Sequence, residues 1–247
     1  MNKSLIIILV AVAVIILAGA GWMMYNNNQV NQNTPTNTTN NNQNQTEGTL
    51  YFSFKDAAAD MGSISAINMT VDKVYVHSQS QGWVTLSTNP QTFSLLALKA
   101  SGNTALMAKA NLKADTYDQM WFHVSSVMVT ETGKTAKQAT MPSADFKMLG
   151  SVKVVAGSNS MATLDVLADQ SLHKTDKGEF IFAPVVEFEG RSNASVTVDT
   201  NNMVTAANGT VDSTTSAGMD INGEVKTNFK LNINSALQIN AGVVNYK

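Results

Sequence analysis

Residues 66–78, AINMTVDKVYVHS, alternate apolar and polar side chains with a period of two, which is typical of a half-buried β-strand. The apolar side chains form two sets of opposite parity, Ile67, Met69 and Val71 in the first and Val74 and Val76 in the second. A strand that keeps both sets in one core needs a bulge or break near Asp72-Lys73, because an inserted residue reverses the faces that follow it. The segment therefore predicts a long, interrupted strand.

The same period recurs on both sides of this segment. Residues 116–131, TYDQMWFHVSSVMVTE, place Met120, Phe122 and Val124 on one strand face and Tyr117, Trp121 and His123 on the other. Residues 92–103, TFSLLALKASGN, do not alternate and predict a strand end followed by a short helical turn. Short strands separated by Gly, Asn and Asp turns predict an all-β sandwich or barrel. We favour an antiparallel β-sandwich with immunoglobulin- or transthyretin-like layers.

The last third of the chain continues the pattern with two special features. Pro184 interrupts EFIFAPVVEFEG, residues 179–190, and predicts an edge strand or a bulge there. Asn222-Gly223 predicts a tight hairpin. Residues 191–247 would form only a marginal core alone, so we expect them to extend a sandwich of residues 49–190 or to dock on it.

The N-terminal residues 1–25, MNKSLIIILVAVAVIILAGAGWMMY, carry one positive charge and then an uncharged, mainly apolar run. About 20 apolar residues span a bilayer. The alternative is a cleaved signal peptide with Ala18-Gly19-Ala20 as the cut site. We favour a retained transmembrane anchor, because the apolar run continues through Trp22. This predicts a single-pass protein of the cell membrane with its C-terminal part extracellular, or a secreted protein if the segment is cleaved.

Residues 26–48, NNNQVNQNTPTNTTNNNQNQTEG, are too polar to form a core and predict a disordered tether. Composition excludes further classes. The net charge is −2 and Arg191 is the single arginine, so we expect no nucleic-acid partner. The chain has no cysteine, which excludes disulfides, thiolate metal sites and a lipid-modified cysteine.

An ordered set of motifs covers residues 49 to about 189. They are FKDAAADMGSISAINMTVDKVYVH, GWVTL, TFSLLALKA, ANLKADTYDQMWFHV and SLHKTDKGEFIFAPVV. In this order the motifs resemble the domain of unknown function 4382 family. The resemblance implies an exported β-rich domain, often tethered to a membrane, with no established activity. The chain keeps the family's His-x-Thr-x-x-Gly pattern at His173, Thr175 and Gly178, but has Asp56-Ala57-Ala58 where members commonly have Asp-Ala-Pro.

Trp83, Tyr117, Trp121 and His123 are candidates for a partner-binding face. Aromatic side chains on an outward sheet face bring large rigid contact area, and they can stack on sugars or anchor a protein. The alternative is that another layer, formed by the C-terminal strands, covers this face.

Polar residues form a second set of candidates. His173, with Asp169 and Asp176 nearby, could act as a base or metal ligand, but turn chemistry explains the whole segment. Asp56 and Asp60 could hold calcium, although solvated turn carboxylates are the simpler interpretation. No sequence motif supports a metal site formed by His77, His123 and His173. None supports a catalytic pair of Glu187 and Glu189 either. We therefore expect no catalytic residue, metal or cofactor.

These observations predict a non-enzymatic, membrane-anchored surface module. Its partner would be a glycan or protein of the cell envelope, or its role would be structural. The first alternative is a metal-dependent extracellular hydrolase. The second is a surface filament subunit that exchanges strands, with NFKLNIN, residues 228–234, completing a neighbour's sheet.

Overall fold

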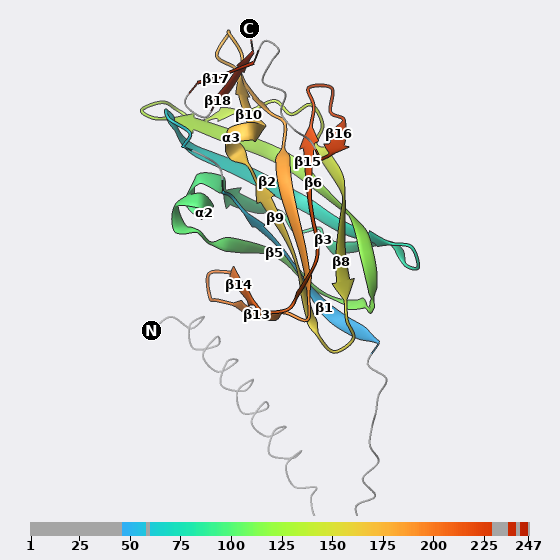
Figure 1. The fold of residues 1–247 in the computed structure, drawn as a ribbon. Helices are drawn as coiled ribbons and strands as arrows, with labels where there is room; N and C mark the ends of the chain where they lie inside the picture. Colours follow the sequence, from blue (N-terminus) through green and yellow to red (C-terminus); the bar gives the residue numbers. More distant parts are fainter. Residues whose placement is uncertain (1–45, 58–59, 229–236, 241–242, 247) are drawn as a thin grey trace, which may run out of the picture. The chain divides into compact units, whose positions relative to one another are not determined.

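A computed structural model describes residues 46–57, 60–228, 237–240 and 243–246 (Figure 1). The predicted anchor 1–25 and almost all of the predicted tether lie outside the described residues. Among the residues described, no helix reaches the length and apolarity that crossing a membrane demands. The first strand begins at Glu47, two residues before the expected boundary.

The described residues form three sheets, which confirms the all-β prediction. Sheet A contains, in spatial order, β13 (Ser195–Val198), β14 (Met203–Ala207), β5 (Thr104–Lys113), β1 (Glu47–Lys55), β9 (Asn159–Val166), β12 (Val185–Ser192), β15 (Thr210–Met219) and β16 (Val225–Thr227). Sheet B contains β3 (Gly82–Ser87), β2 (Ile64–Ser78), β6 (Asp115–Glu131) and β7 (Lys137–Gln138), with β4 (Gln91–Ser94) paired to β2 and β8 (Asp145–Val154) paired to β6. Sheet C contains β11 (Phe180–Phe182), β10 (Leu172–Lys174), β18 (Val243–Tyr246) and β17 (Leu237–Asn240).

Two short helices complete the described elements, α2 (Leu95–Ser101) and α3 (Ala168–Ser171). The first follows β4 directly, so the predicted strand end and helical turn are confirmed. It ends at Gly102, whose left-handed backbone (φ +64°) lets its N–H bond the last carbonyls of the helix.

Strands β2 and β6 run antiparallel along most of their length and form the spine of sheet B. Their register shifts on both sides of Val71, between Thr70 and Val71 and again before Lys73. Val71 and Val74 are both fully buried as a result. The predicted interruption near Asp72-Lys73 is confirmed.

Sheets A and B pack face to face in a sandwich-like arrangement. Phe54 of sheet A contacts Phe93 and Phe122 of sheet B, with ring centroids 5.0 and 5.4 Å apart. Phe122 also stacks on Phe146 of β8 at 5.0 Å. All four rings are buried, because the period-two alternation of their strands turns one face of each sheet inward.

Strand β8 belongs to sheet B, yet it lies beside β15 of sheet A (Figure 1). Side chains of β15 form hydrogen bonds with the backbone of β8. The Ser213 hydroxyl accepts from the Ser151 N–H (2.9 Å) and donates to the Ser151 carbonyl (2.8 Å). The Thr215 hydroxyl donates to the Leu149 carbonyl (3.0 Å). One side of the sandwich is therefore closed by side chains rather than by a backbone ladder.

Two features depart from the sequence prediction. Strands β1 and β9 pair in parallel, so sheet A is mixed rather than purely antiparallel. The segment 179–190 is not one strand. It breaks at Ala183-Pro184, and β11 joins sheet C while β12 joins sheet A, because proline cannot donate to a ladder.

Strands after residue 190 occupy both edges of sheet A. The β15–β16 hairpin turns through Asn222-Gly223 as predicted, with Gly223 at φ +84° and the Gly223 N–H donating to the Asp220 carbonyl. The β13–β14 hairpin pairs with β5 at the opposite edge. Of the NFKLNIN segment proposed for strand exchange, all but Asn228 lies outside the described residues.

Candidate functional site

An aromatic cluster lies on the outer face of sheet B and consists of Tyr75, His77, Trp83 and Trp121. Antiparallel pairing places Tyr75 opposite Trp121 and His77 opposite Trp83. The Tyr75 and Trp121 rings stack with centroids 4.5 Å apart and an interplanar angle of 15°. Three strands, β3, β2 and β6, thus hold the cluster on a rigid platform.

Trp83 is the most exposed member, with 39% of its surface accessible. Its ring meets Trp121 edge to face at 6.1 Å and His77 at 5.1 Å. The Lys147 ammonium lies 4.6 Å from the Trp83 ring centroid, within cation–π range. Trp83 therefore offers a fixed aromatic surface to solvent with a positive charge beside it.

Hydrogen bonds hold the rim of the cluster. The Trp121 indole N–H donates to Asp145 (3.1 Å). Asp118 bonds the His77 ring (2.9 Å) and accepts from Gln79 (3.1 Å), and the bond to His77 is the main cause that lowers the pKa of Asp118. These bonds fix the orientation of the rings.

Of the four residues predicted for a binding face, the structure brings Trp83 and Trp121 together. His123 lies one outward position further along β6, where it bonds Asp72 rather than joining the cluster. Tyr117 is not on this face, and that prediction is wrong. A register shift between Tyr117 and Gln119 reverses the strand face, so Tyr117 is 1% exposed and its hydroxyl donates to the Lys113 carbonyl (3.2 Å).

Sequence reasoning missed Tyr75 as a member of the cluster. Its outward position follows from the apolar parity of Val74 and Val76, but its contact with Trp121 depends on the pairing of β2 with β6. The C-terminal strands β13 to β16 belong to sheet A, so the described part of the C-terminal region leaves Trp83 accessible.

His173 lies in β10 opposite Ile181 and is only 3% exposed, and this burial lowers its pKa to about 4. The residues after it form the expected turn: the Thr175 hydroxyl accepts from the Glu179 N–H (3.2 Å), and Gly178 adopts φ +77°. Asp176 is exposed in that turn. His173 thus lies in the core beside the turn rather than in it.

The loop acids Asp56 and Asp60 have different hydrogen-bond partners. Asp56 is 5% exposed and accepts a long bond from the Ala168 N–H (3.5 Å), whereas exposed Asp60 accepts from the Gly62 N–H (3.1 Å). Across the described ranges, no group of three or more His, Asp or Glu side chains is arranged to hold a metal ion.

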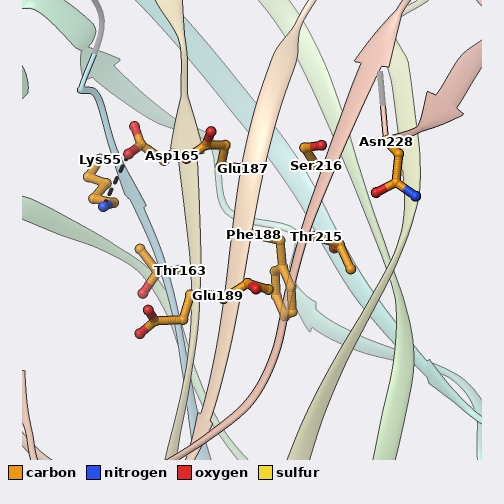
Figure 2. A pocket seen from close by; sticks show the side chains of 10 residues that line it. Lys55, Thr163, Asp165, Glu187, Phe188, Glu189, Thr215, Ser216 and Asn228 are labelled. Atoms are coloured by element: carbon orange, nitrogen blue, oxygen red, sulfur yellow. Dashed lines mark ion pairs between the residues drawn. The ribbon is translucent and has the colours of Figure 1, made fainter. Parts of the chain in front are cut away.

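A polar groove of about 410 Å³ lies over the outer face of sheet A (Figure 2). Its lining includes Lys55, Thr163, Asp165, Glu187 and Glu189. Asp165 is ion-paired with Lys55 (3.1 Å), and Glu189 accepts two bonds from Arg191. The sequence indicated that Glu187 and Glu189 share a strand face, but not that a groove forms beside them.

No curated protein and no solved structure matches this chain. A family model, described as a domain of unknown function (DUF4382), matches residues 47–184. The match begins with β1, includes every member of the aromatic cluster, and ends where Pro184 separates β11 from β12. Because it spans more than half of the chain, the protein belongs to the DUF4382 family.

Proposed function

We propose that this protein is a membrane-anchored, extracellular, non-enzymatic binding module that recognises a cell-envelope glycan through the aromatic cluster. The observation that carries the proposal is the exposed Trp83 ring, fixed against Trp121 and His77 on a three-stranded platform.

The chemistry of the cluster favours a saccharide. The face of an aromatic ring carries partial negative charge and attracts the polarised C–H groups of a sugar. The Tyr75 hydroxyl and the Trp83 indole N–H have no hydrogen-bond partner among the described residues, and the Lys147 ammonium has no carboxylate partner there. These groups are available to bond sugar hydroxyls around a stacked ring.

The anchor and the extracellular location rest on the apolar residues 1–25 and the polar tether, and they remain predictions. Immunoglobulin- or transthyretin-like layering is likewise part of the proposal, supported by the packing of sheets A and B around Phe54, Phe93 and Phe122. The metal-dependent hydrolase gains no support from the arrangement of the three histidines, since His77 and His123 each bond an aspartate and His173 lies in sheet C.

The proposal is tested by measuring how residues 44–247 bind to isolated envelopes. These residues form a compact unit. We expect Trp83→Ala to weaken binding at least about tenfold, because aromatic anchors dominate recognition energy. Ile221→Ala removes an exposed apolar side chain elsewhere and serves as the matched control.

Two treatments of the envelopes identify the class of partner. Periodate, which cleaves vicinal diols, should abolish binding, whereas protease digestion should leave it intact. The opposite pattern would show a protein partner and refute the glycan proposal, and equal binding by Trp83→Ala would refute the site.

A further inference from the structure

The outer face of sheet A is divided into an apolar and a polar part. The β13–β14 hairpin contributes Val204 to a small apolar cluster with Tyr51 and Met161, which lies apart from the main core. Beyond this cluster the same face carries the polar groove. Its volume falls within the range of small-ligand sites, about 300–1,000 Å³.

One row of side chains crosses the groove, and we call it the polar row. It consists of Lys55, Asp165, Glu187, Ser216 and Asn228, and Figure 2 shows these side chains in sequence across the strands. Register places Lys55 beside Asp165, Asp165 opposite Glu187, and Glu187 opposite Ser216. The Asn228 N–H donates to the Ser216 carbonyl (2.7 Å), which puts Asn228 at the end of the row.

The two halves of the polar row differ in their internal bonding. The Asp165 carboxylate is ion-paired with the Lys55 ammonium (3.1 Å) and accepts a hydrogen bond from the Ala57 N–H (2.8 Å). Within the described ranges, the side chains of Glu187, Ser216 and Asn228 make no hydrogen bond or ion pair. A carboxylate, a hydroxyl and a carboxamide are therefore available side by side on adjacent strands.

The available groups define the ligand. The cations Lys55 and Arg191 already pair with Asp165 and Glu189, which disfavours an anion. The Glu187 carboxylate only accepts hydrogen bonds, whereas Ser216 and Asn228 both accept and donate. Such a set complements hydroxyl groups, and the strand spacing of about 4.8 Å is close to the length of one hexose unit.

The Lys55–Asp165 ion pair serves the fold, but Glu187 gains no such partner among the described residues. Asp165 and Glu187 carry like charges directly opposite each other, an arrangement that destabilises a sheet. This repulsion between Asp165 and Glu187 is consistent with a binding role, because functional sites retain interactions that are unfavourable for folding.

We infer that the polar groove is a second saccharide site, which binds a neutral, polyhydroxylated chain through Glu187, Ser216 and Asn228. The groove and the aromatic cluster lie on the outer faces of different sheets. A module with both sites bridges two glycan chains, and this bridging role rests on the proposed function.

The test uses residues 44–247 and the neutral polysaccharide fraction of protease-treated envelopes. Binding is measured by equilibrium titration, and bridging by the turbidity of the mixture. The variants are Trp83→Ala, the pair Glu187→Ala with Ser216→Ala, and all three together, while Glu179→Ala replaces an exposed turn carboxylate as the control. Thermal melts confirm that each variant is folded.

We expect the wild type and Glu179→Ala to bind and to become turbid. Trp83→Ala should bind more weakly than the wild type, as stated above, but still measurably, the groove pair should also still bind, and both should lose turbidity. The triple variant should bind at least tenfold more weakly than either. Unchanged turbidity of the groove pair, or complete loss of binding in Trp83→Ala, overturns the second site and leaves the proposed function standing. Absence of binding by the wild type overturns both.

Discussion

His173 is a neutral imidazole in the interior of the protein at neutral pH. Its side chain is almost fully buried, and burial lowers its pKa to about 4 because the charged form is desolvated. An unfolded histidine titrates near pH 6.5. Between these two values the unfolded chain binds more protons than the folded chain, so stability falls as the pH decreases from about 6.5 toward 4.

This difference can be measured by urea unfolding. Protonation of the unfolded His173 should lower the free energy of unfolding by about 2–3 kcal/mol between pH 7 and about pH 4.5. We expect His173→Gln, which cannot be protonated, to show a smaller loss over the same interval. An identical loss in both proteins would show that His173 does not control the acid response.

Glu131 also loses its contribution to stability on acidification, but at lower pH. Its carboxylate accepts from Lys134 (2.8 Å) and Lys174, and these bonds lower its pKa to about 2. The depressed pKa contributes stability that is present above the unfolded value near 4.5 and is lost as the pH falls toward 2. Because Lys174 belongs to β10, the pair also ties sheet C to the end of β6.

Replacing Glu131 by Gln should lower the free energy of unfolding at pH 7 by about 1–3 kcal/mol, since a buried charge-assisted bond is lost. Chemical denaturation measures the change. Glu224→Gln, at a largely exposed ion pair, is the control and should change stability by less than about 0.5 kcal/mol. Equal effects of the two substitutions would contradict the anchoring role.

At the scale of elements, the closure of the sandwich depends on glycine where β8 crosses β12. A Cβ atom at Gly190 would lie 2.1 Å from the Ser151 carbonyl oxygen, and one at Gly150 would lie 2.7 Å from the Phe188 ring. Both positions have ordinary negative φ, so the requirement is close approach of the strands and not backbone conformation.

Gly190→Ala should therefore push β8 away from β12 and lower the unfolding free energy by about 1–3 kcal/mol. Gly133→Ala offers a contrast, because its Cβ would meet open space and its cost comes from φ +74° alone. Thermal melts of both variants measure the effect. A stability of Gly190→Ala equal to the wild type would show that the strands have room to separate.

At the scale of the whole molecule, residues 44–247 form one compact unit in which early and late segments share sheet A. Strand β1 lies between β5 and β9, while β13 to β16 occupy both edges of the same sheet. Unfolding of strands β13 to β16 would expose the small apolar cluster of Tyr51, Met161 and Val204. It would also expose the edge of β12 that pairs with β15.

We therefore expect residues 44–247 to unfold in a single cooperative transition. Differential scanning calorimetry should give a calorimetric enthalpy equal to the van't Hoff enthalpy. Two resolved transitions would show that the strands after residue 190 form a separate cooperative unit.

Local alternation was enough to predict much of this molecule, because the faces of a strand follow a period of two in the sequence. It predicted the all-β class, the interruption near Asp72-Lys73 and the outward positions of Trp83 and Trp121, while the Asn-Gly dipeptide predicted the turn at residues 222–223. Pairing between distant segments could not be predicted in this way. The single shift beside Asp118 buries Tyr117, and only the order of strands sets Tyr75 against Trp121 and aligns Lys55, Glu187 and Asn228 in one row. Register and strand order arise from long-range packing, where one extra residue reverses every face that follows it.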